Sequence, residues 1–137
     1  MRQQNRRAFV ISTSLIGCLT LFFTSASYGQ DITSKTISFP RGRNVTAVND
    51  FVGGEIIRSY IVRAKEGQTL TITLTSPEKR AEFSVSTEEL GSQVSFGRET
   101  QTRRSRQWAG KIPKTGNYYI SVTAFPSANY SLRFKLE

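Results

Sequence analysis

The fold is decided by Trp108-Ala-Gly-Lys-Ile-Pro-Lys-Thr-Gly-Asn-Tyr-Tyr-Ile-Ser-Val122 and, after a short turn, Asn129-Tyr-Ser-Leu-Arg-Phe-Lys-Leu136. Apolar side chains recur at every second position and so share one face of an extended chain: Tyr118, Ile120, Val122 and Ala124, then Tyr130, Leu132, Phe134 and Leu136. This period of two predicts two strands joined by a tight, uncharged turn at residues 124–128. The stretch predicts an architecture and contains no evident chemistry.

Turn residues and aromatic residues give the expected scaffold. Pro113 fixes φ before a turn, and we expect Gly67 and Gly116 to adopt left-handed φ in the turns Lys-Glu-Gly-Gln and Lys-Thr-Gly-Asn. Trp108 and Tyr60 are expected in the core or at its rim, with their polar atoms on backbone partners. Tyr118 and Tyr119 are neighbours on a strand, so only one of them can face the core.

The same period of two continues through the rest of the chain after the first thirty residues. Strands are expected at 37–39, 56–63, 70–74, 83–85, 107–112, 118–125 and 130–136, with 45–48 and 94–96 as optional short strands. Seven or eight short strands separated by turn residues, with no helical period, predict an all-β antiparallel β-sandwich.

The first 29 residues predict where in the cell the protein is sent. Arg2, Arg6 and Arg7 precede an apolar run from Ala8 to Phe23, and small residues follow. This order is typical of a secretory signal peptide, with cleavage expected after Ser27 or Gly29. The remaining segment, residues 30–137, is expected to be a single domain, exported to the periplasm or the medium.

Two alternatives to ordinary export remain open. Asn5-Arg6-Arg7 resembles a twin-arginine motif, and Leu15-Ile16-Gly17-Cys18 resembles a lipobox whose cysteine would be acylated. The apolar run continues beyond Cys18, which favours ordinary signal cleavage over a lipid anchor. No second apolar stretch is long enough to span a bilayer.

Composition argues against the common catalytic constellations. The chain has no His, and its single Cys lies in the predicted signal, so no Ser-His pair, Cys-His pair or His-based metal site can form. The adjacent carboxylates Glu88 and Glu89 would face opposite sides of a strand. Asp31, Asp50 and Glu55 are not spaced as a calcium ladder. We therefore expect neither an enzyme nor a cofactor.

Positive charge is the clearest functional signal. Three of the 19 basic residues lie in the predicted signal, which leaves 16 against 10 acidic residues and a net charge of +6. Four arginines with one nearby Glu crowd a segment that shows no strand pattern: Arg98, Arg103, Arg104 and Arg106. Guanidinium groups bind carboxylates and phosphates bidentately, so an acidic protein cleft or an anionic envelope polymer would fit. Nucleic acid is the least expected partner, and a solvated basic connection is the alternative.

Four groups of residues carry a resemblance to a known family. They are Tyr60-Ile-Val-Arg-Ala-Lys-Glu-Gly-Gln68; the alternating Leu70, Ile72 and Leu74; the series Trp108, Gly110, Pro113, Gly116, Tyr118, Ile120 and Val122; and Ala128-Asn-Tyr130 with Leu132. Over residues 33–137 the chain resembles the bacterial pre-peptidase C-terminal domain, especially the small secreted form that includes the periplasmic inhibitor of g-type lysozyme. The resemblance implies a non-catalytic β-sandwich. It also implies a partner-binding neighbourhood at Ile57-Arg58-Ser59-Tyr60.

Three functions follow as alternatives. The first is a secreted non-catalytic binding module that engages an anionic partner through the arginine-rich segment. The second is an inhibitor of g-type lysozyme, although the family's final hairpin tends to be longer and more charged than residues 124–128. The third is an accessory domain that acts with a separate secreted protease. The oligomeric state is left open.

Overall fold

The computed structural model describes residue 29, residues 31–89, residue 91, residues 93–101 and residues 105–137. These residues form nine strands and no helix: β1 Ile32–Thr36, β2 Val45–Gly53, β3 Ile57–Ala64, β4 Thr69–Thr75, β5 Ala81–Ser86, β6 Arg98–Gln101, β7 Ser105–Lys111, β8 Gly116–Ala124 and β9 Ser127–Leu136. The predicted all-β sandwich is confirmed. Accordingly, the described chain offers no helix long and apolar enough to cross a bilayer.

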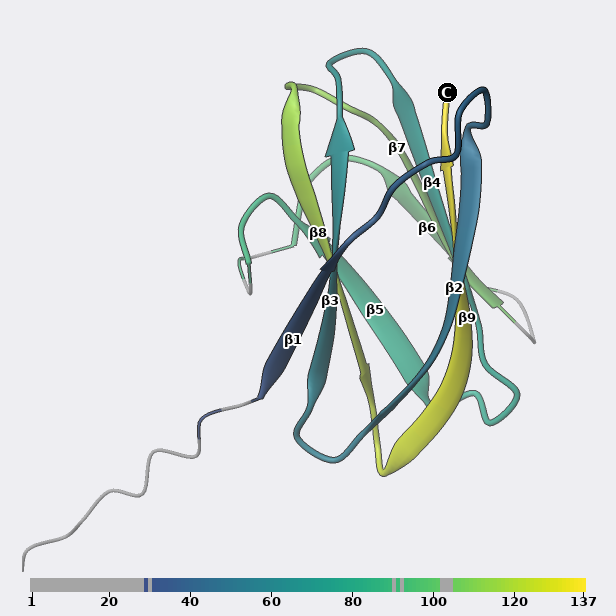
Figure 1. The fold of residues 1–137 in the computed structure, drawn as a ribbon. Helices are drawn as coiled ribbons and strands as arrows, with labels where there is room; N and C mark the ends of the chain where they lie inside the picture. Colours follow the sequence, from purple (N-terminus) through teal and green to yellow (C-terminus); the bar gives the residue numbers. More distant parts are fainter. Residues whose placement is uncertain (1–28, 30, 90, 92, 102–104) are drawn as a thin grey trace, which may run out of the picture.

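The strands form two facing sheets (Figure 1). Sheet A has the order β1-β3-β8-β5, and sheet B has the order β2-β9-β4-β7-β6. Every pair is antiparallel except β1 and β3, which run parallel. Most neighbours are therefore distant in the sequence, and the core forms only when these distant segments meet.

The core lies between the sheets and follows the alternation seen in the sequence. On β8 and β9 the predicted apolar positions face inward, from Tyr118 to Ala124 and from Tyr130 to Phe134. Tyr118 is buried and Tyr119 is half-buried, which confirms that only one of the pair belongs to the core. Since β9 lies between β2 and β4, its inward residues occupy the centre of sheet B.

Trp108 is packed by an aromatic residue and by two glycines. The Phe96 ring lies 5.7 Å from the Trp108 ring and 5.9 Å from the Tyr118 ring, edge to face in both pairs. A Cβ atom at Gly97 would overlap the indole, and one at Gly110 would lie 2.7 Å from Trp108 Cη2. The predicted scaffold role of Gly110 therefore has a specific cause, which is room for the indole.

Several local expectations need correction. Gly67 has φ of 86° as expected, but Gly116 does not have positive φ and instead begins β8. The first strand, β1, ends at Thr36 and so lies before the expected range 37–39. Residues 94–96 pack on the core without forming a strand. The arginine-rich segment is not a plain loop, because β6 pairs with β7 from Arg98 to Gln101. The predicted signal peptide falls on residues 1–29, of which only residue 29 lies within the described part.

Candidate binding surfaces

The four arginines of the predicted binding segment have different surroundings. Arg98 is exposed on β6, whereas Arg103 and Arg104 lie outside the described residues. Arg106 on β7 is partly buried, and its guanidinium lies 2.8 Å from a Glu82 carboxylate oxygen and 3.8 Å from one of Glu99. Because two carboxylates compensate its charge, Arg106 contributes little to an outward positive field.

Strand register extends the positive charge of Arg98 across the outer surface of sheet B. The side chains that point away from the core alternate with buried ones, and the cations among them come from β6, β7 and β9: Arg98, Lys111, Arg133 and Lys135. Arg98 pairs with Ala109, which pairs with Thr71, which pairs with Lys135. Glu137 lies 2.7 Å from the Lys135 ammonium. We call this surface the basic face.

The basic face is polar. Its centre is the outward row of β4, which consists of Thr69, Thr71, Thr73 and Thr75. Sequence reasoning missed Lys111, Arg133 and Lys135, because they are separate single charges on alternating strands. Alternate positions on each strand face outward, so these three residues could have been assigned to one surface once the strand order was known.

The neighbourhood of Arg58 and Tyr60 is mostly structural. The Tyr60 hydroxyl donates to Asp50 Oδ2 at 3.0 Å and lies 2.5 Å from the Tyr130 hydroxyl. Arg58 is half-buried, and its Nε donates to the Phe51 carbonyl at 3.3 Å. Tyr60 is 1% exposed, so its assignment to a partner surface is corrected: it is a core residue.

Burial controls the ionisation of this tyrosine pair. The pKa of Tyr60 is raised to about 12, chiefly by desolvation. The hydrogen bond to Tyr130 opposes this increase, and the one to the Asp50 carboxylate contributes to it. Burial, together with the hydrogen bond to Tyr60, also raises the pKa of Tyr130. Both phenols are therefore neutral hydrogen-bonding groups near neutral pH.

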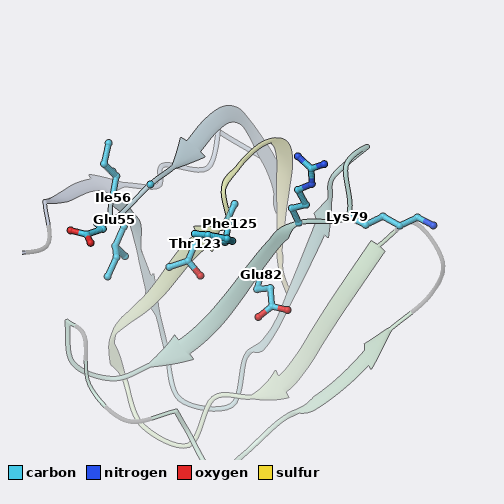
Figure 2. A pocket seen from close by; sticks show the side chains of 10 residues that line it. Glu55, Ile56, Lys79, Glu82, Thr123 and Phe125 are labelled. Carbon is cyan, nitrogen blue, oxygen red and sulfur yellow. The ribbon is translucent and has the colours of Figure 1, made fainter.

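A pocket of about 490 Å³ lies at one end of the sandwich. The β2–β3, β4–β5 and β8–β9 connections form it together with the adjoining strand ends. Figure 2 shows Thr123 and Phe125 between Glu55 and Ile56 on one side and Lys79 on the other. The Phe125 side chain is 85% exposed. The short, uncharged turn therefore presents an aromatic ring beside a pocket.

Among the residues that the structure describes, no three His, Cys, Asp or Glu side chains cluster as metal ligands. Glu88 and Glu89 are both exposed, and Glu89 accepts a hydrogen bond from the Ser34 hydroxyl. What the pocket and the basic face offer chemically is hydrogen bonding, charge and the exposed aromatic rings of Phe125 and Phe51.

Comparison with known proteins places the fold. No protein-family model matches the sequence, and no curated protein is similar enough in sequence to match it. Among solved structures, PliG of Aeromonas hydrophila, a periplasmic inhibitor of g-type lysozyme, superposes with a TM-score of 0.61 at 24% identity, over 78% of this chain and 98% of that one. PliG of Salmonella Typhimurium superposes with a TM-score of 0.56 at 15% identity, over 76% and 97%.

A second kind of protein has the same architecture. The pre-peptidase C-terminal domain of a Bacillus anthracis collagenase superposes with a TM-score of 0.55 at 12% identity, over 80% of this chain and 97% of that domain. At these identities the likeness concerns the fold. The resemblance predicted from the sequence is confirmed at that level: the chain has the β-sandwich fold shared by the PliG lysozyme inhibitors and this pre-peptidase C-terminal domain.

Proposed function

We propose that this chain is an exported, non-catalytic binding module that engages an anionic partner through its basic face. The observation that carries the proposal is the gathering of Arg98, Lys111, Arg133 and Lys135 on one surface, with Glu137 as the carboxylate paired to one of them. Exposed cations on one surface steer an oppositely charged partner and fix its orientation. Arg103 and Arg104 lie outside the described residues and add positive charge to the proposal from the sequence alone.

A protein with an acidic surface is the preferred partner. Proteins of this fold include inhibitors whose partner is a lysozyme. Arginine forks such as those of Arg98 and Arg133 match carboxylates bidentately, and a sheet face suits another folded surface. An anionic envelope polymer would be held by the same charges and is distinguished by experiment.

Inhibition of g-type lysozyme is the second candidate function. It is favoured by the fold shared with two PliG proteins. An inhibitor must enter a substrate cleft, and in this chain the β8–β9 turn is short, with Phe125 and Pro126 between the strands. An accessory role beside a separate secreted protease, as the collagenase domain suggests, is the remaining alternative.

The test compares charge reversals on opposite sheets. R98E and R133E lie on the basic face, and R63E, at an exposed position on β3, is the matched control. Each reversal replaces an attraction of about 0.2–1 kcal/mol by a similar repulsion, so binding to polyglutamate should weaken about two- to thirtyfold for R98E and R133E. Equal losses in R63E would show that only total charge matters. The same titrations with polyphosphate, a polyanion that is not a peptide, compare an anionic polymer with the carboxylates of an acidic protein.

Two further measurements separate the alternatives. Purified exported protein is titrated into g-type lysozyme, and failure to inhibit at micromolar concentration would exclude the inhibitor function. Mass spectrometry of the exported protein identifies its N-terminus, which we expect to follow Ser27 or Gly29. An acylated Cys18 at the N-terminus would instead show a lipid anchor.

A further inference from the structure

The end pocket continues as a groove along the outer face of sheet A. A second cavity of about 310 Å³ adjoins the pocket and shares Ile57, Glu82 and Thr123 with it. Beyond these residues the second cavity is lined by Ser84 and Ser121. The two cavities therefore form one path that runs from the exposed Phe125 ring over strands β5 and β8.

Strand register orders the groove floor into two polar rows. Thr123 on β8 lies opposite Glu82 on β5. One step further along, Ser121 lies opposite Ser84 on one side and opposite Ser59 on the other. Ile57 is buried on the same face, outside the main core, and supplies an apolar edge. Hydroxyl groups are thus spaced by the sheet itself along a partly apolar floor.

The polar groups of the groove are held in place. The Glu82 carboxylate accepts a hydrogen bond from the Arg106 guanidinium at 2.8 Å, which compensates its charge and leaves oxygen lone pairs for other donors. Ser59 is 0% exposed, and its hydroxyl has no hydrogen-bond partner among the described residues. A buried hydroxyl without a partner is costly, and because it is fully covered Ser59 supports the floor beneath Ser121 rather than facing a ligand.

This chemistry suits a ligand rich in hydroxyl groups. Serine and threonine hydroxyls both donate and accept, and a carboxylate accepts from neighbouring hydroxyls. An exposed aromatic ring offers its negative face to the C–H groups of a sugar ring. We propose that the groove from Phe125 to Ser84 binds a linear, uncharged glycan. The proposal does not depend on the basic face, which belongs to the other sheet.

Other occupants fit this groove less well. A polyanion would find no net positive charge in the pocket, because Glu55 and Glu82 line it together with Lys79 and Arg80, whereas on the basic face Glu137 pairs with one of four cations. An extended peptide added by strand pairing needs a free strand edge. Strand β8 is hydrogen-bonded on both sides, and at the outer edge of β5 the Val85 carbonyl already accepts from Val94 N–H. The groove therefore offers side chains to its ligand. Over β5 and β8 these are the hydroxyls of Ser84, Ser121 and Thr123 and the amide of Gln93, and nearer Phe125 they include charged groups of both signs.

The test is a titration with three neutral tetrasaccharides: β-1,4-linked N-acetylglucosamine, β-1,4-linked glucose and α-1,4-linked glucose. Using the full exported protein, we expect at least one of them to cause saturable shifts of the amide NMR signals of Ser84, Ser121 and Thr123. Phe125→Ala should weaken that binding about two- to tenfold, and Thr123→Val by a similar factor.

Matched controls come from sheet B. Phe51→Ala removes the other exposed large aromatic, which is 49% exposed on β2, and Thr75→Val removes an exposed threonine of β4. Neither should change saccharide affinity, nor should R98E. The proposal is overturned if no tetrasaccharide shifts the groove signals, or if Phe51→Ala weakens binding as much as Phe125→Ala. Polyglutamate shifting the groove signals instead would also overturn it.

Discussion

Removing the hydroxyl of Tyr60 should destabilise the protein more than removing that of Tyr130, although the two phenols share one hydrogen bond. Asp50 can only accept, so the Tyr60 hydroxyl donates to the carboxylate and the Tyr130 hydroxyl donates to Tyr60. Y130F leaves the bond from Tyr60 to Asp50 intact. Y60F breaks both bonds and leaves the Tyr130 hydroxyl in a residue that is 3% exposed.

The magnitudes follow from this difference. Y130F loses one neutral hydrogen bond, which is worth about 0.5–1.5 kcal/mol net. Y60F loses that bond and a bond to a carboxylate. It also leaves the buried Tyr130 hydroxyl without an acceptor, at a cost of about 1–3 kcal/mol. We therefore expect Y60F to lower the free energy of unfolding by about 2–4 kcal/mol. In the Y60F/Y130F double variant no donor is stranded, so its loss should be smaller than the sum of the single losses.

Equilibrium unfolding in urea measures all three variants against the parent protein, with the slope of free energy against urea as a check on two-state behaviour. The double-variant cycle gives the coupling between the hydroxyls, expected at about 1 kcal/mol or more. A Y130F loss equal to or larger than the Y60F loss would refute the proposed direction of the hydrogen bonds. Strict additivity would show that the stranded hydroxyl finds another partner.

Two further predictions concern alkaline pH and the glycines. The pKa of Tyr60 rises on folding from 10.0 to about 12, so its contribution to stability is complete below pH 10 and is lost as pH increases through about 12. The free energy of unfolding in urea should therefore decrease over this pH range, in step with the phenolate absorbance. A free energy of unfolding that does not change over this range would contradict the prediction. G67A places a side chain at positive φ in open space and should cost about 1 kcal/mol, whereas G97A also overlaps Trp108 and should cost about 1–3 kcal/mol more in the same assay.

The sequence predicts the local part of the fold well. The alternation in β8 and β9 identified the inward residues, because one face of each strand is buried and the period of two is strict. Gly116 was misjudged because a glycine after Lys-Thr is typical of a turn, and the chain had already entered β8 there. The parallel pairing of β1 with β3 leaves no local trace in the sequence.

The candidate surfaces were less predictable, since they are assembled by strand register. The arginine cluster was visible as a run, but Arg106 turned out to be paired with Glu82. The basic face adds Arg133, which lies far from Arg98 in the sequence. In the groove, Ser84 and Ser121 meet only because β5 pairs with β8. A single sequence without known pairing cannot bring such residues together.

The position of β9 has a consequence for how the chain reaches its folded state. Val45 pairs with Lys135, and β9 also separates β2 from β4. Sheet B therefore cannot close during synthesis until residues 127–136 are available, and folding must wait for a large loop to close. An incomplete chain would expose two unpaired strand edges that invite aggregation.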